Sequence, residues 1–157
     1  MKAKLLFLFV FASLLAGCGK DKYTTKPQVE IKSIKQGEVF NPAGGNANFI
    51  EFDLTVTDKE GDAQGEIIID KLDAPSPACQ LNSFTDEVYT IPNFPGEPNQ
   101  KVNVKVKYAS GSIIGYGTLS GNNCNSQPHI AIFRFRIVDK TGDTSNAVQS
   151  DPITLPF

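Results

Sequence analysis

The feature of this sequence that most constrains its fold is a strict alternation of apolar and polar side chains in short segments. In residues 48–57, polar residues alternate with Ile50, Phe52, Leu54 and Val56. A period of two places successive side chains on opposite faces of a β-strand, so this segment is predicted to be a half-buried strand. Similar alternation, or a short apolar run, marks six further segments: 29–35, 65–72, 87–91, 101–108, 130–138 and 148–155.

Turn-forming residues separate these segments, and no helix of useful length is predicted after the first residues of the chain. Seven or eight short strands with turns between them predict an all-β fold, an antiparallel immunoglobulin-like β-sandwich. In that arrangement residues 48–57 pair with 101–108, which would set Glu51 and Asp53 opposite Lys105 and Lys107. Residues 112–119 are either an added strand or a continuation of the preceding hairpin.

The start of the chain differs in composition from the rest. A short basic stretch precedes an apolar run at residues 5–15, which is too short to span a bilayer and fits the core of a secretory signal peptide. The Leu-Ala-Gly-Cys sequence that ends at Cys18 resembles the bacterial lipobox. The resemblance implies cleavage before Cys18 and acylation of that cysteine, with firm anchoring by two or more chains. The alternative is an ordinary signal peptide followed by a chance cysteine.

These observations divide the chain into three parts. Residues 1–17 are the predicted lipoprotein signal peptide, 18–28 the lipidated cysteine with a flexible tether, and 29–157 the sandwich domain. The lipobox, the tether and the strand-turn segment at 133–146 together resemble small lipoproteins of Bacteroidetes-type bacteria that carry one immunoglobulin-like domain. That resemblance implies a lipid-anchored protein of the cell envelope, in the outer membrane on its periplasmic or surface face. It assigns no site residues.

Two cysteines remain after Cys18 is assigned to the lipid. Cys79 and Cys124 form an even pair in an exported chain, which predicts a disulfide between two long loops; two free buried thiols are the alternative. A zinc site is disfavoured because His129 is the only histidine.

The motif Asp-Lys-x-Gly-Asp occurs twice, each time at the end of a predicted strand. One interpretation of the motif is a type I turn, in which the Asp side chain caps the backbone and Gly adopts a backbone dihedral that other residues avoid. The second account is a Ca²⁺ site, because both strands end at one pole of the sandwich and Ca²⁺ prefers several oxygen ligands. Lys59 and Lys140 could act as internal counterions. The candidate ligands are Asp58, Glu60, Asp62, Asp139 and Asp143.

Charge and catalytic motifs narrow the function classes. The whole chain has 17 acidic and 15 basic side chains, and two of the lysines belong to the signal peptide, which argues against nucleic acid as a partner. No Gly-x-Ser-x-Gly nucleophile motif accompanies His129. A non-enzymatic protein is therefore expected.

Two hypotheses of function follow. The first is a binding or structural module that contacts an envelope protein or a glycan. The second is a calcium-dependent adhesion, glycan-binding or enzyme-accessory domain that uses the acidic loops. Four aromatic residues could supply a ligand surface or pack in the core: Tyr89, Phe94, Tyr108 and Tyr116.

Overall fold

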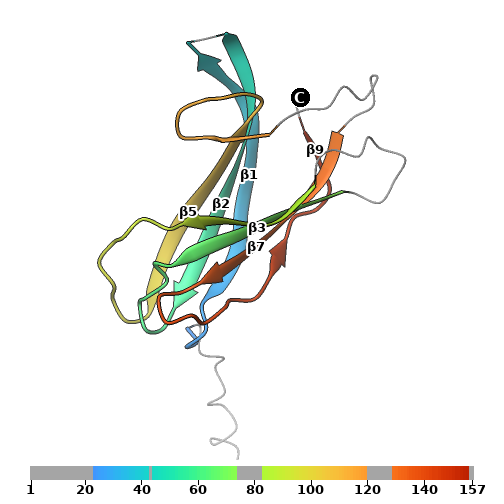
Figure 1. The fold of residues 1–157 in the computed structure, drawn as a ribbon. Helices are drawn as coiled ribbons and strands as arrows, with labels where there is room; N and C mark the ends of the chain where they lie inside the picture. Colours follow the sequence, from blue (N-terminus) through green and yellow to red (C-terminus); the bar gives the residue numbers. More distant parts are fainter. Residues whose placement is uncertain (1–22, 43, 74–82, 120–128, 156–157) are drawn as a thin grey trace, which may run out of the picture.

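Two β-sheets packed face to face make up the domain (Figure 1). The computed structural model describes residues 23–42, 44–73, 83–119 and 129–155. The strands are β1 (Gln28–Asn41), β2 (Gly45–Asp58), β3 (Glu66–Asp73), β4 (Phe84–Thr90), β5 (Gln100–Ala109), β6 (Gly117–Thr118), β7 (His129–Val138), β8 (Val148–Gln149) and β9 (Ile153–Leu155). The first sheet has the order β1-β2-β5-β6. The second has the order β4-β3-β7-β8, and β9 also pairs with β7.

All strand pairs are antiparallel except β5 with β6, and the predicted immunoglobulin-like sandwich is confirmed. The count is higher than predicted for two reasons. The last predicted strand, 148–155, is interrupted and forms β8 and β9. Of the segment 112–119, only the two residues of β6 are strand, and they add to β5 in parallel.

The pairing of β2 with β5 has the predicted register. Asp53 lies opposite Lys105, and Glu51 lies opposite Lys107. The Lys105 ammonium is 2.8 Å from a carboxylate oxygen of Glu51 and 3.3 Å from one of Asp53. These cross-strand ion pairs lie on the outer face of the first sheet, where solvent screens them, and they support this register.

β4 belongs to the second sheet, where it pairs with β3 and sets Tyr89 opposite Ile67. In constant-type immunoglobulin domains the fourth strand instead joins the first sheet, beside the fifth. A buried carboxylate helps to hold β4 in its place: Asp70 accepts a hydrogen bond of 2.7 Å from the Asp86 amide and one of 2.7 Å from Arg134 Nε. Because β4 does not lie beside β5, most of that edge of the first sheet has no neighbouring strand in the described part of the chain.

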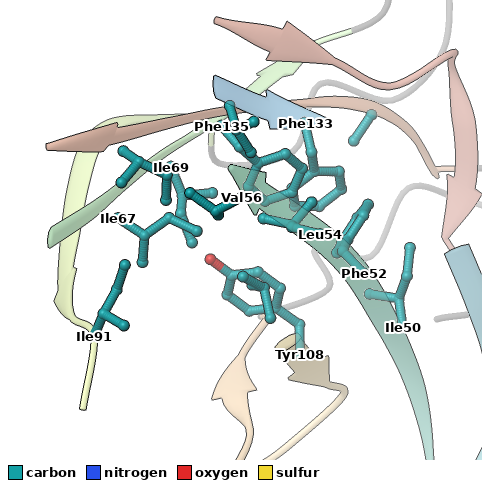
Figure 2. Close-up of a cluster of buried hydrophobic side chains, with 14 of the residues drawn as sticks. Ile50, Phe52, Leu54, Val56, Ile67, Ile69, Ile91, Tyr108, Phe133 and Phe135 are labelled. Atoms are coloured by element: carbon teal, nitrogen blue, oxygen red, sulfur yellow. The ribbon is translucent and has the colours of Figure 1, made fainter. Parts of the chain in front are cut away.

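The core lies between the sheets and is built by the inward side chains of the alternating segments (Figure 2). Phe52 of the first sheet packs between two rings of β7, with ring centroids 4.8 Å from Phe133 and 5.0 Å from Phe135. The fully buried apolar side chains include Ile50, Phe52, Leu54, Ile69, Phe133, Phe135 and Ile137. Burial of each such side chain stabilises the fold by roughly 1.5–3 kcal/mol, from which the entropy lost on ordering the chain must be subtracted. The alternation of buried and exposed side chains also fixes the register of the strands.

The predictions about the three cysteines fall outside the described residues. Cys18 precedes residue 23, and both Cys79 and Cys124 lie in the gaps between the described ranges. Lipidation of Cys18 and the disulfide therefore remain predictions. Within the described residues, no helix has the length and apolar character needed to cross a membrane.

Candidate cation site

The two Asp-Lys-x-Gly-Asp segments meet at one end of the sandwich. Asp58 is the last residue of β2 in the first sheet, and Asp139 follows β7 in the second. Figure 1 shows both strands ending at the pole where β1 begins. Asp58, Asp62 and Asp139 each offer one carboxylate oxygen, and these oxygens lie within 4.8 Å of one another. We call these three residues the acidic cluster.

Two of the five predicted ligands do not join the acidic cluster. The Glu60 side chain is exposed, and Asp143 is partly exposed and stands outside the group. Glu60 and Asp143 lie in the same two loops as the clustered residues, so the motif located the loops correctly. It could not tell which carboxylates point inward, because that depends on the path of each turn.

Each strand-end aspartate uses one oxygen to hold its own turn. Asp58 Oδ2 accepts hydrogen bonds from the Gly61 amide at 2.6 Å and the Asp62 amide at 2.9 Å. Asp139 Oδ1 accepts from the Thr141 amide and hydroxyl, both at 2.9 Å, and from the Asp143 amide at 2.8 Å. The predicted capping of the backbone by Asp is therefore confirmed in both segments. The second segment also has the backbone hydrogen bond of a turn, from the Gly142 amide to the Asp139 carbonyl at 3.2 Å.

The glycine of each motif adopts the left-handed conformation that the turn requires, with φ of +80° at Gly61 and +93° at Gly142. A side chain at Gly61 would also collide with the backbone of Glu97. Gly142 has open space around it. The first turn is thus fixed by conformation and by packing, the second by conformation alone.

The second oxygen of each aspartate has no hydrogen-bond partner in the described part of the protein. Asp58 Oδ1, Asp139 Oδ2 and one oxygen of Asp62, Oδ1, are all buried in this state. The Asp58 side chain is fully buried and Asp139 is 5% exposed. Buried polar atoms without partners are uncommon in native proteins, and a buried unpaired charge is strongly unfavourable.

The neighbouring lysines do not neutralise the cluster. Lys59 and Lys140 are exposed, and among the described residues neither forms an ion pair with a carboxylate of the cluster. Burial raises the pKa of the Asp62 carboxyl, and the nearby Asp58 and Asp139 carboxylates raise it further. The cluster therefore has a strong electrostatic preference for a bound positive charge.

The spacing of the three residues, with one carboxylate oxygen taken from each, fits a calcium ion. Ca²⁺ binds oxygen ligands at about 2.3–2.6 Å, so two oxygens on one ion are at most about 5 Å apart. The separations within 4.8 Å meet that limit. Three carboxylates would supply half or fewer of the six to eight ligands that Ca²⁺ takes, and water or carbonyl oxygens would supply the others.

Asn146 connects this pole to the first strand, a role that the sequence did not indicate. The Val29 amide donates to Asn146 Oδ1 at 2.8 Å, and Asn146 Nδ2 donates to the Val29 carbonyl at 3.0 Å. The Lys59 amide also donates to the Thr24 carbonyl, at 3.2 Å. The beginning of the domain is thus hydrogen-bonded to both acidic loops. No local spacing rule could have paired residues so distant in sequence.

The remaining candidate residues lie elsewhere. Tyr89, Tyr108 and Tyr116 line a pocket whose other walls come from β3 in the second sheet and β5 in the first. Phe94 packs against the hydrophobic core. His129 is buried at the beginning of β7, and its Nδ1 has no hydrogen-bond partner among the described residues. Tyr108, which pairs with Ile50, and His129 lie at the opposite ends of their strands from the acidic cluster.

Comparison of the chain with protein-family models, with curated proteins and with solved structures finds no match.

Proposed function

We propose that this protein is a lipid-anchored, non-enzymatic module of the bacterial cell envelope whose acidic cluster binds one calcium ion. The observation that carries the cation site is the set of three buried carboxylate oxygens without partners, contributed by loops of both sheets. The anchor rests on the lipobox-like sequence that ends at Cys18. Binding of an envelope protein or glycan is the expected task of the domain.

A bound ion would act first on the stability of the domain. Asp58 terminates a strand of the first sheet and Asp139 follows a strand of the second, so one ion would cross-link the two sheets. The same pole holds the beginning of β1 through Asn146. Calcium would therefore reinforce the end of the domain at which the tether from Cys18 arrives.

The burial of its ligands favours such a structural ion over one that contacts a glycan directly. Asp58 and Asp139 are almost completely enclosed, which leaves few coordination positions open to a ligand. The chain between Cys18 and Thr24, whose carbonyl accepts a hydrogen bond from Lys59, can extend about 20 Å, so the acidic pole lies toward the membrane unless the domain tilts. Both points support a role for the ion in the anchored half of the domain.

The experiment that tests the site compares thermal unfolding of the protein in excess calcium and in chelator. We expect a higher Tm in calcium, because an ion that binds only the folded state stabilises it by mass action. Asp62→Asn should sharply reduce this difference, since it removes one of the three negative charges that attract the ion. Asp143→Asn is the matched control: it removes the same charge from the same kind of loop outside the cluster and should keep the calcium response. Coincident Tm values for the unaltered protein would refute the site.

The anchor is tested by metabolic labelling of cells with a radioactive fatty acid. The unaltered protein should incorporate label and sediment with membranes, whereas Cys18→Ser should lose both properties. Cys79→Ser serves as the control, because it alters a cysteine that is not expected to carry lipid. Equal labelling of the unaltered and Cys18→Ser proteins would rule out the anchor and leave the calcium test unaffected.

A further inference from the structure

One edge of the first sheet is open along most of β5. On one side β5 pairs with β2 through its whole length, from Gln100 to Ala109. On the other side β6 pairs only with Tyr108 and Ala109. Residues 101–106, which we call the open edge, have no strand on that side among the described residues.

The hydrogen bonds at the end of β5 show which backbone groups face outward. The Ser110 amide donates to the Asn48 carbonyl on the β2 side, and the Leu119 amide donates to the Ala109 carbonyl on the opposite side, both at 2.9 Å. Because neighbouring residues of an antiparallel strand direct their amides and carbonyls to opposite sides, Asn103 and Lys105 direct theirs away from β2. These groups could form a further ladder.

An apolar pocket lies directly beside the open edge. Its volume is about 370 Å³, and its walls come from both sheets. The lining includes Ile67, Ile69, Tyr89, Val104, Val106 and Tyr108. The Tyr89 and Tyr108 hydroxyls both donate to the Glu87 carboxylate, at 2.7 and 3.3 Å, which fixes two rings at the pocket wall. Inward side chains of a strand added to β5 would enter this pocket.

The outer face of β5 carries an alternating row of lysines: Lys101, Lys105 and Lys107. Antiparallel pairing with a second copy of β5 would bring lysines against lysines, which is unfavourable. An incoming strand with acidic side chains on the same face would instead find opposite charges at Lys101, which has no ion pair among the described residues. It would also meet the part-exposed ammonium groups of Lys105 and Lys107, which already contact Glu51 and Asp53. The row therefore selects against self-association, as lysines on edge strands commonly do, and in favour of an acidic partner.

From this combination we propose that the open edge of β5 binds an extended segment of a partner protein in which apolar residues alternate with acidic ones. The segment continues the first sheet by backbone hydrogen bonds to Asn103 and Lys105. Its apolar side chains fill the pocket, and its acidic side chains face the lysine row. Strand addition of this kind draws affinity from the backbone and specificity from alternate side chains.

The test uses a blocked synthetic peptide of alternating valine and glutamate, with a valine–lysine peptide as the charge-reversed control. Amide hydrogen exchange of the purified protein is followed at Asn103 and Lys105. Exchange of both amides should be fast in the free protein. It should slow about tenfold when the glutamate peptide is present at ten times its Kd, and the lysine peptide should have no effect.

A pair of variants isolates the backbone contribution. Lys105→Pro removes an outward amide, which the edge of a sheet tolerates, and Lys105→Ala removes the same side chain but keeps the amide. We expect Lys105→Ala to retain most of the peptide binding and Lys105→Pro to lose it. Equal binding by the two variants would overturn the proposal, as would failure of the unaltered protein to distinguish the two peptides.

Two results without peptide are also decisive. Slow exchange at Asn103 and Lys105 in dilute free protein would show that another part of the chain already covers the edge. Protection that grows with protein concentration would identify a second copy as the occupant. Either result would overturn the proposal.

Discussion

Asp58 ends a strand of the first sheet and Asp139 follows a strand of the second, yet each presents a carboxylate oxygen within 4.8 Å of one on the other. Each has one oxygen engaged by the amides of its own turn and one that is buried without a partner. This arrangement separates two roles within a single side chain: one oxygen shapes the loop, and the other remains available for a cation.

That division of roles predicts opposite effects of Asp58→Asn in the two metal conditions. The asparagine keeps an oxygen for the turn and removes one negative charge from the cluster. In chelator the variant should therefore be as stable as the unaltered protein or more stable, by about 1 kcal/mol. In excess calcium it should be less stable, because a ligand is lost. Chemical denaturation in both buffers measures the difference, and a loss of stability of the same size in both would contradict the cation role.

The two motif glycines should respond differently to substitution by alanine. Gly142→Ala strains only the backbone and should lower the free energy of unfolding by about 1 kcal/mol. Gly61→Ala adds a collision with Glu97 and should have a larger effect, about 3 kcal/mol. Urea unfolding of the two variants in chelator gives the comparison, and equal losses would argue against the close packing of Glu97 on Gly61.

Asn146→Ala should loosen the attachment of β1 to the acidic pole. The substitution removes both hydrogen bonds to Val29 and should destabilise the domain by about 1–2 kcal/mol. Amide exchange at Val29 should accelerate more than exchange in the central strands. Gln149→Ala, at an exposed position on β8, is the control and should change neither quantity. An unchanged exchange rate at Val29 in the Asn146 variant would be the contrary result.

Asp70 should make the domain sensitive to acid. Burial tends to raise its pKa, but the Asp86 amide, Arg134 and Arg136 more than offset this and hold the pKa below the usual 3.8. A lowered pKa contributes stability above the unfolded-state value, and that stability is lost as pH falls through the folded-state value. Asp70→Asn should therefore cost about 2–3 kcal/mol at pH 7 and progressively less below pH of about 4. A cost that does not change with pH would show that the charge of Asp70 is unimportant.

Much of the fold was predictable because it depends on local alternation. The inward set of Ile50, Phe52, Leu54 and Val56 determined both the strand and its buried face. The pairing of β2 with β5 followed from the fold class and was supported by opposite charges at Asp53 and Lys105. The position of β4 did not follow, because the Asp70 contacts that attach it to β3 join residues of different strands and leave no periodic signal.

The candidate site was predictable only in part. Repetition of Asp-Lys-x-Gly-Asp identified two loops, and the fold class brought them to one pole. Which three of the five acidic residues converge depends on the left-handed glycines and on the capping bonds of Asp58 and Asp139. Asn146 escaped notice because its partner Val29 is at the opposite end of the domain sequence.

Calorimetric titration of calcium into the metal-free protein tests the central claim most directly. We predict one site per chain with a Kd of about 0.1–1 mM, the range of extracellular calcium modules. Binding should be lost in the double variant Asp58→Asn, Asp139→Asn and kept in Asp143→Asn. Absence of saturable binding to the unaltered protein at millimolar calcium, or equal binding by the double variant, would contradict a calcium site at the acidic cluster.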